Sequence, residues 1–185
     1  MLTIHHGTGV RPCTDEDRPA DAGHALVVSA DRIAAVGPFR ELYEEFGAGA
    51  RVREWPGVIT PGLHRARAEE LLEHAYFPDP REAAELGTEP LTGEALAALE
   101  MTEARWGGSA RRGLRELLAT GTTSLSGHFR RTSVRTAVER SPIRVLPEAR
   151  PRTLAPSGAA DFAVFAPDGS CLATVLGGRL LHRSR

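Results

Sequence analysis

The sequence contains no lysine, no asparagine and no glutamine, so all 23 residues in its lysine-plus-arginine total are arginines. This absence excludes a Schiff-base lysine, the phosphate-binding lysine of a P-loop and a lysine carbamate that bridges two metal ions. Any catalysis by this chain would therefore rest on histidine, aspartate, glutamate, serine, threonine, cysteine, tyrosine or arginine.

Cysteine is also scarce. Cys13 and Cys171 lie far apart in the sequence and outside any CxxC spacing. This pattern gives no support to a thiol-redox site or a zinc ribbon, and two isolated cysteines usually remain reduced in a cytosolic protein. We expect no disulfide.

Long apolar runs are absent as well. The N-terminus shows no basic stretch followed by an apolar core, and no run approaches the roughly 20 apolar residues of a membrane-spanning helix. Acidic and basic side chains nearly cancel, with a formal net charge of -1. We expect a soluble cytoplasmic protein with no membrane association. The abundance of alanine, arginine, glycine and proline is typical of a high-GC bacterial genome.

The first sixty residues favour strands. Residues 2–5 form a short apolar run, and the apolar runs 25–29 and 32–36 are joined by a two-residue turn that predicts a hairpin. Residues 38–46 predict a helix that packs on the sheet, because apolar side chains recur at helical spacing. Residues 51–59 return to an extended pattern. The apolar stripe of the helix is Phe39, Leu42, Tyr43 and Phe46.

The middle of the chain favours helices. Residues 66–76 predict one helix, and residues 93–119 predict one helix or two, with an interruption at Gly107-Gly108. Residues 122–125 and 143–146 predict strands with a helix at 132–140 between them, which is the start of a βαβ alternation. On the long helix the apolar face comprises Leu114, Leu117 and Leu118, and the opposite face comprises Arg111, Arg112 and Arg115.

The last forty residues return to strands. Residues 147–156 contain three prolines and predict a linker. Residues 161–166 and 171–176 predict two strands around a Pro-Asp-Gly turn, and residues 179–182 are extended.

Three stretches of sequence are similar to the two ends of an amidohydrolase. They are residues 24–37, residues 58–63 with the run Val-Ile-Thr-Pro-Gly-Leu, and residues 154–180 with the run Ala-Asp-Phe-Ala-Val-Phe. In their order and spacing they resemble the amidohydrolase superfamily, in particular the branch of imidazolonepropionase and aminodeoxyfutalosine deaminase. Residues 121–124 fall where that family places its second barrel strand.

This resemblance implies an α+β fold with two parts. Residues 1–62 plus 152–185 would form the small composite β-sandwich domain of the family, built from both ends of the chain. Residues 63–151 would form a mainly helical remnant of its (β/α)8 barrel. About ninety residues are too few for a closed barrel, which takes about 200 or more.

The resemblance also locates the expected metal ligands. Family members follow Pro-Gly-Leu with a His-x-His motif that binds a divalent metal, and the two corresponding positions here hold Arg67 and Glu69. A guanidinium stays protonated and offers no lone pair to a metal. The sequence therefore predicts no metal site and no metal cofactor, and the parent chemistry is expected to be lost.

Several polar side chains remain as weak candidates. His64, Glu69 and His74 lie close to the lost motif, and Glu70 and His74 are four residues apart on the expected helix. We interpret them as a solvated helix flank, because two potential ligands on one helix are common and a catalytic metal normally has three protein ligands. Two further pairs are interpreted as surface or loop residues: His5 and His6, whose side chains would alternate along a strand, and Ser126 with His128, which follow a predicted strand.

Arginine clusters supply another candidate. Such clusters can bind phosphate through bidentate contacts, but the net charge of -1 and the lack of a known motif argue against nucleic-acid binding. The clusters are Arg105, Arg111, Arg112 and Arg115, then Arg130, Arg131, Arg135 and Arg140.

Three functional hypotheses follow. The first is a non-catalytic amidohydrolase-like protein that acts by protein association, as a homo-oligomer or with a partner, or by small-molecule binding, because truncation of a barrel exposes apolar surface. The second is a hydrolase of non-peptide carbon-nitrogen bonds with a site rebuilt around His64, Glu69 and His74 or completed by another chain, and only this alternative calls for zinc. The third is phosphate or nucleic-acid binding by the arginine clusters.

Overall fold

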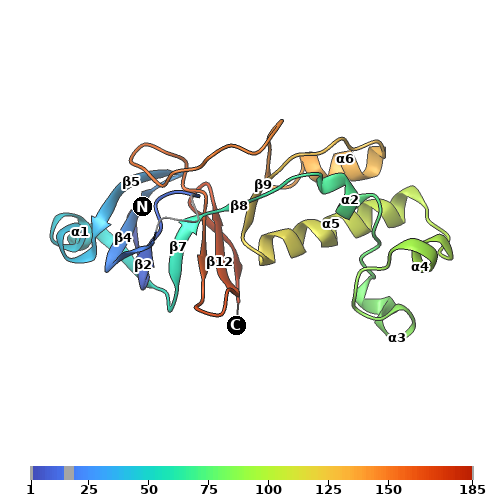
Figure 1. Cartoon of the computed structure of the whole chain (residues 1–185), viewed down its shortest axis with the longest axis horizontal. Coiled ribbons are helices and arrows are strands. Elements are labelled where there is room, and N and C mark those ends of the chain that lie inside the picture. The colour runs from blue at the N-terminus through green and yellow to red at the C-terminus, as the bar shows by residue number, and fades with distance from the viewer. Residues whose placement is uncertain (1, 15–18, 185) are drawn as a thin grey trace. The chain divides into compact units, whose positions relative to one another are not determined.

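Strands occupy both ends of the chain and helices its middle (Figure 1). The computed structural model describes residues 2–14 and 19–184. The mixed α+β class predicted from the sequence is confirmed. The strands are β1 (Leu2–His6), β2 (Gly9–Val10), β3 (Asp21–Ala22), β4 (His24–Ser29), β5 (Arg32–Pro38), β6 (Ala50–Glu54), β7 (Val58–Pro61), β8 (Leu63–Arg65), β9 (Thr122–Leu125), β10 (Arg144–Val145), β11 (Phe162–Phe165), β12 (Cys171–Leu176) and β13 (Arg179–Arg183). The helices are α1 (Phe39–Phe46), α2 (Ala68–Leu72), α3 (Ala83–Leu86), α4 (Gly93–Ala97), α5 (Glu103–Ala119) and α6 (Thr132–Glu139), with 3-10 turns at Gly47–Gly49 and Pro80–Glu82.

The chain divides into two compact units. Unit 1 comprises the described residues of Met1–Leu63, Leu118–Thr123 and Arg150–Arg185. Unit 2 comprises His64–Leu117 and Ser124–Ala149.

Unit 1 contains two sheets. One has the strand order β5-β4-β1-β6, and the other has the order β13-β12-β11-β7-β2-β3. In the larger sheet the N-terminal strand β7 pairs antiparallel with the C-terminal strand β11, with Phe162 opposite Pro61 and Val164 opposite Ile59. The two ends of the chain therefore fold together within this unit.

Two hydrophobic clusters stabilise unit 1. The first contains buried side chains of both sheets, among them Leu26 of β4 and Phe162 of β11. In the second, α1 packs on the other face of the smaller sheet, where Leu42 meets Ile4 and Val27 (Figure 1). The predicted hairpin β4-β5 and the predicted packing of α1 are confirmed. Tyr43 departs from the predicted apolar stripe because 51% of it is exposed.

Unit 2 is built around α5. Its buried face, which includes Trp106, Ala110, Leu114 and Leu117, packs with Leu72 and Phe77 at Gly113, where an added Cβ would lie 2.8 Å from both of these side chains. In the sheet of order β10-β9-β8, β10 runs parallel to β9, with α6 between them in the chain. This confirms the predicted strand-helix-strand segment.

Two helix predictions for unit 2 are wrong. The break predicted at Gly107-Gly108 does not occur, because α5 runs through both glycines and the buried contacts of Trp106 and Ala110 offset their cost of about 1 kcal/mol each. The break lies instead before Glu103, where the Thr102 hydroxyl accepts a hydrogen bond from the Arg105 backbone N–H at 3.2 Å. A threonine at this position is an N-cap signal in the sequence.

The helix predicted for residues 66–76 is also too long. α2 ends at Leu72, and Ala75, Tyr76 and Phe77 are all buried in an extended stretch in which Tyr76 forms an antiparallel bridge with Leu91. Three consecutive buried side chains do not fit one face of a surface helix. Tertiary packing therefore overrides the local helix preference here.

Candidate functional site

The first position expected to bind metal holds Arg67 on the surface. Its side chain is 75% exposed and forms an ion pair with Glu70. The backbone of Arg67 has φ +52°, in the left-handed region, and it immediately precedes α2. A charged guanidinium at this place cannot ligate a cation and repels one.

The second position holds Glu69, which lies against the loop after β9. A Cβ added to Gly127 would be 2.3 Å from the Glu69 Oε2 atom, so this carboxylate packs closely against the backbone of the loop. Oε2 is buried and accepts no hydrogen bond from the described residues. Burying a carboxylate oxygen without a hydrogen-bond donor costs free energy. Glu69 is unusual among the acidic residues of unit 2 in this respect.

His64 lies between two serines. Its Nδ1 is 2.8 Å from the Ser124 hydroxyl and its Nε2 is 3.1 Å from the Ser126 hydroxyl. A neutral imidazole donates through one ring nitrogen and accepts through the other, so one hydroxyl donates to His64 and the other accepts from it. Ser124 is completely buried, whereas Ser126 is half-buried.

The loop after β9 joins these residues to α2. The Ala68 backbone N–H donates to the Ser126 carbonyl, and the Ser126 N–H donates to the Arg65 carbonyl. Ser126 was expected beside His128 in a loop, but its hydroxyl lies 3.1 Å from His64 Nε2, and His128 is exposed. Ser124 was missed, although its separation of two from Ser126 would have put both on one side of a strand.

His74 does not join this group, contrary to the hypothesis of a site built from His64, Glu69 and His74. It is exposed, lies beyond the end of α2 and lines an open pocket of about 510 Å³ with Trp106 and Arg131. The neighbouring Glu73 is buried and accepts a hydrogen bond from the Arg131 backbone N–H at 2.7 Å. The prediction that Glu70 and His74 share a helix face is therefore wrong, because the helix stops at Leu72.

The residues present do not fit a catalytic metal. Throughout residues 2–14 and 19–184, no three histidine, cysteine, aspartate or glutamate side chains gather closely enough to hold a metal ion. A catalytic zinc ion normally has three protein ligands. Both cysteines are free thiols.

The N-terminal histidines are not a surface pair. They do lie on opposite sides of β1 as predicted, but His5 is 1% exposed and makes a T-shaped contact with Phe162, while His6 stacks on Phe39. The His5 Nδ1 accepts a hydrogen bond from Trp55 Nε1 at 3.2 Å. Burial, with a smaller effect from the charge of Arg53, lowers the pKa of His5 to about 3. His5 is thus a neutral part of the core.

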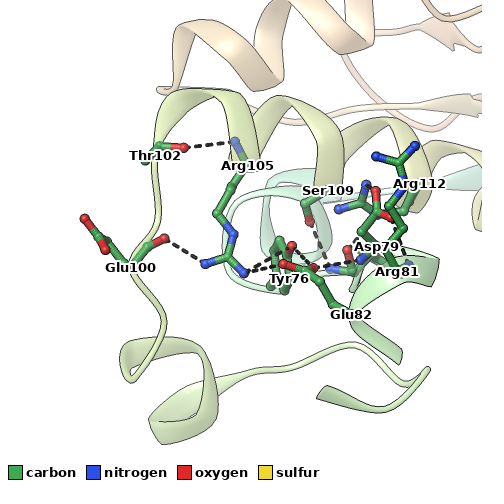
Figure 2. Close-up of polar contacts among 10 residues, drawn as sticks. Tyr76, Asp79, Arg81, Glu82, Glu100, Thr102, Arg105, Ser109 and Arg112 are labelled. Atoms are coloured by element: carbon green, nitrogen blue, oxygen red, sulfur yellow. Dashed lines mark hydrogen bonds and ion pairs between the residues drawn. The ribbon is translucent and has the colours of Figure 1, made fainter. Parts of the chain in front are cut away.

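Several arginines of the predicted clusters are held within unit 2, as Figure 2 shows. Arg105 binds Glu82 at 2.8 Å and lies over the Tyr76 ring, 4.9 Å from its centroid. The Tyr76 hydroxyl donates to Glu82 at 2.5 Å, and this bond is the main reason that the pKa of Glu82 lies below its usual value.

Arg112, a member of the first predicted arginine cluster, has partners within unit 2. It donates to the Phe77 carbonyl at 2.8 Å and pairs with Asp79 at 3.2 Å (Figure 2). Arg131 lies 4.2 Å from the centroid of the Trp106 ring. These contacts bind unit 2 together and leave fewer guanidinium groups for phosphate than the sequence implied.

Comparison with known proteins gives structural matches only. No protein-family model matches the sequence, and no curated protein matches it. A zinc-bound adenosine deaminase from Xanthomonas campestris matches with a TM-score of 0.54 at 18% identity, over 78% of this chain and 33% of that protein. The ochratoxinase of A. niger matches with a TM-score of 0.50 at 22% identity, over 78% of this chain and 30% of that protein.

A third solved structure also matches most of this chain at low sequence identity. The Helicobacter pylori aminofutalosine deaminase, in complex with methylthio-coformycin, has a TM-score of 0.51 at 14% identity, over 77% of this chain and 34% of that protein. The chain thus spans about a third of the length of these structures. It shares its fold with part of amidohydrolase-superfamily deaminases and hydrolases, as the sequence resemblance predicted.

None of the helices in the described part of the chain combines the length and apolarity needed to cross a bilayer.

Proposed function

We propose that this chain is an amidohydrolase-like protein that acts by binding a second protein chain and not by metal-dependent hydrolysis. The observation that carries the proposal is Arg67, a solvent-exposed cation paired with Glu70 at a position where the family places a metal ligand. Unit 1 would be the composite β-sandwich, and unit 2 would be the remnant of the barrel.

The fold supports this assignment in two places. In unit 1, β7 and β11 bring the two ends of the chain into one sheet, which shares a hydrophobic cluster with the other sheet. The strands β9 and β10, with α6 between them in the chain, form a parallel strand-helix-strand segment, and the residues that pair belong to unit 2. A barrel would continue this alternation, whereas β10 is the last strand of its sheet.

The edge strand β10 is the surface that we assign to association. It has a neighbour on one side only, and its Val145 is 54% exposed. An exposed apolar side chain on an edge strand favours contact with another chain, and parallel sheets are normally covered on both faces. A second copy of this chain carries the same edge, so self-association is the form of binding to test first.

We expect Val145→Glu to weaken self-association by at least about tenfold, since it buries a charge in the proposed contact. Light scattering after size-exclusion chromatography over a range of concentrations measures this. The matched control is Tyr43→Glu, because Tyr43 is similarly exposed, at 51%, but lies on α1. A wild-type chain that stays monomeric, a control that dissociates equally, or zinc-dependent deamination by the isolated chain would contradict the proposal.

A second candidate function rests on the pair His64 and Ser126. With its Nε2 3.1 Å from the Ser126 hydroxyl, His64 can take the proton of that hydroxyl while the Ser126 oxygen attacks the carbonyl carbon of a substrate, and can pass this proton to the amine or alcohol that leaves. Water would then release the acyl group from Ser126. Ser124, bonded to Nδ1 at 2.8 Å, would orient the ring. This is a metal-independent form of the hydrolase alternative, with Ser126 as the proposed nucleophile.

This second candidate predicts an activity that survives chelation. Hydrolysis of activated amides or esters would be lost by about a hundredfold or more in Ser126→Ala, because the nucleophile is removed. Ser141→Ala in the loop after α6 is the control and should retain activity. Equal rates for wild type and Ser126→Ala would eliminate the catalytic role and leave His64 as a structural residue.

A further inference from the structure

A small pocket at the edge of unit 1 is lined by three arginines. It has a volume of about 230 Å³, and none of its lining residues belongs to the group around His64. The side chains that matter are Arg51, Arg53 and Arg183, with Trp55 and Leu180 beside them and Glu54 on the rim.

The strand β6 presents two of these arginines. β6 is an edge strand of the smaller sheet, and Arg51 and Arg53 are two residues apart, so they point to the same side of it. Val52 points to the other side, where it packs with the cluster under α1. The strand therefore separates an apolar face from a cationic one.

A bulge in β13 supplies the third arginine. Ala173 pairs with Arg183 and Val175 pairs with Leu180, so Leu181 is an extra residue in this strand. Leu180 and Arg183 are three apart and would face opposite ways in a regular strand, but the bulge lets both face the pocket. Leu180 also packs against the main hydrophobic cluster.

No ion pair to a described residue neutralises the three guanidinium groups, although the carboxylate of Glu54 lines the same pocket. Within residues 2–14 and 19–184, none of their side chains has an ion pair or a hydrogen-bond acceptor. Burial and, next, the charges of Arg51 and Arg183 lower the pKa of Arg53. Like charges held together in this way repel one another unless an anion lies between them.

The wall of the pocket is held in place by aromatic contacts. Trp55 is 7% exposed, donates its Nε1–H to His5 and stacks parallel to the His5 ring. The guanidinium of Arg183 lies over the Trp55 ring, 5.6 Å from its centroid. A cation over a tryptophan face is stabilised and loses rotational freedom, so Arg183 is oriented before any ligand binds.

We propose that this pocket binds a small oxyanion of the phosphate type, either inorganic phosphate or the phosphate group of a small molecule. Arginine matches phosphate oxygens with two parallel hydrogen bonds. The volume of about 230 Å³ is below the roughly 300–1,000 Å³ of pockets that enclose drug-sized ligands, which favours a compact anion. The inference is independent of the proposed function.

The test is calorimetric titration of the full chain with inorganic phosphate against sodium chloride of equal ionic strength. Phosphate is expected to bind the wild type and to raise its melting temperature. Arg53→Leu should bind about ten to a hundredfold more weakly, because a charge-assisted bidentate contact is lost. Arg179→Leu is the matched control, since Arg179 is exposed on the same strand β13 but does not line the pocket.

Two further readouts separate binding from structure. Without phosphate, Arg53→Leu should melt at or above the wild-type temperature because repulsion is relieved, and Arg51→Leu should repeat this result. Glycerol phosphate that binds more tightly than inorganic phosphate would identify an organic phosphate as the ligand, and equal binding would identify the free anion. Binding no stronger than that of chloride, or equal binding by wild type and Arg53→Leu, would overturn the proposal.

Discussion

Lowering the pH from 7 to 4.5 is expected to reduce the free energy of unfolding by about 2–3 kcal/mol through His5 alone. The folded-state pKa of His5 is about 3, because burial opposes its charge, whereas the unfolded chain titrates near the ordinary value of 6.5. Below pH 6.5 the imidazole of His5 takes up a proton in the unfolded state but stays neutral in the folded state. This stability is therefore complete above pH 6.5 and is lost as the pH falls towards about 3.

Urea unfolding at a series of pH values measures this effect. The comparison is with His5→Gln, whose side-chain oxygen can still accept the Trp55 Nε1–H but does not titrate. All carboxylates are common to both proteins, so the difference between the two pH profiles isolates His5. Parallel profiles for wild type and His5→Gln would show that the ring is not held neutral in the core.

We expect Gly178→Ala to destabilise unit 1 by about 2–5 kcal/mol. Gly178 has φ +71°, and a Cβ on it would lie 1.9 Å from the Ala30 carbonyl oxygen, a backbone atom that cannot turn aside. The expected loss combines about 1–2 kcal/mol for the left-handed conformation with about 1–3 kcal/mol for overpacking. Gly178 also donates its N–H to the Ala160 carbonyl, so a shift of this turn disturbs the neighbouring segment.

Gly169→Ala is the control for this variant. Gly169 also has a positive φ, +85°, and lies in the other hairpin turn of the same sheet, but a Cβ added to it would meet nothing within 4 Å. We expect Gly169→Ala to lower the free energy of unfolding by only about 1–2 kcal/mol, the cost of the left-handed conformation. Chemical unfolding of both variants gives the comparison, and equal losses would show that the contact with Ala30 carries no cost.

Strands and turns were predictable wherever the pattern was local. The two apolar runs on either side of the turn at Ala30, and the Pro-Asp-Gly turn, predicted the two hairpins, and the spacing of Phe39 and Leu42 predicted α1. The helices of unit 2 were less predictable, because Gly107 and Gly108 lie inside α5 and the helix-forming stretch after Leu72 is extended. In both places buried contacts outweigh propensities of about 1 kcal/mol or less per residue.

The candidate site was predictable only in part. His64 and Glu69 were found from their distance to the Pro-Gly-Leu motif, and the chemistry of Arg67 follows from its residue type alone. Ser124 was missed because a hydroxyl carries no signal until a partner some sixty residues away, His64, lies 2.8 Å from it. The arginine pocket was missed for the same reason, since Arg53 and Arg183 lie far apart in the sequence.

Residue identity alone limits the chemistry open to this chain, because without lysine the Schiff-base and lysine-carbamate mechanisms are closed regardless of conformation. Local pattern establishes most strands, because alternation and turn residues act over a few positions. Long-range packing alone establishes that His5 is neutral, that His64 is held by two serines and that a bulge aims Arg183 at Arg53. Burial, dielectric and register are properties of the folded chain, and no short stretch of sequence contains them.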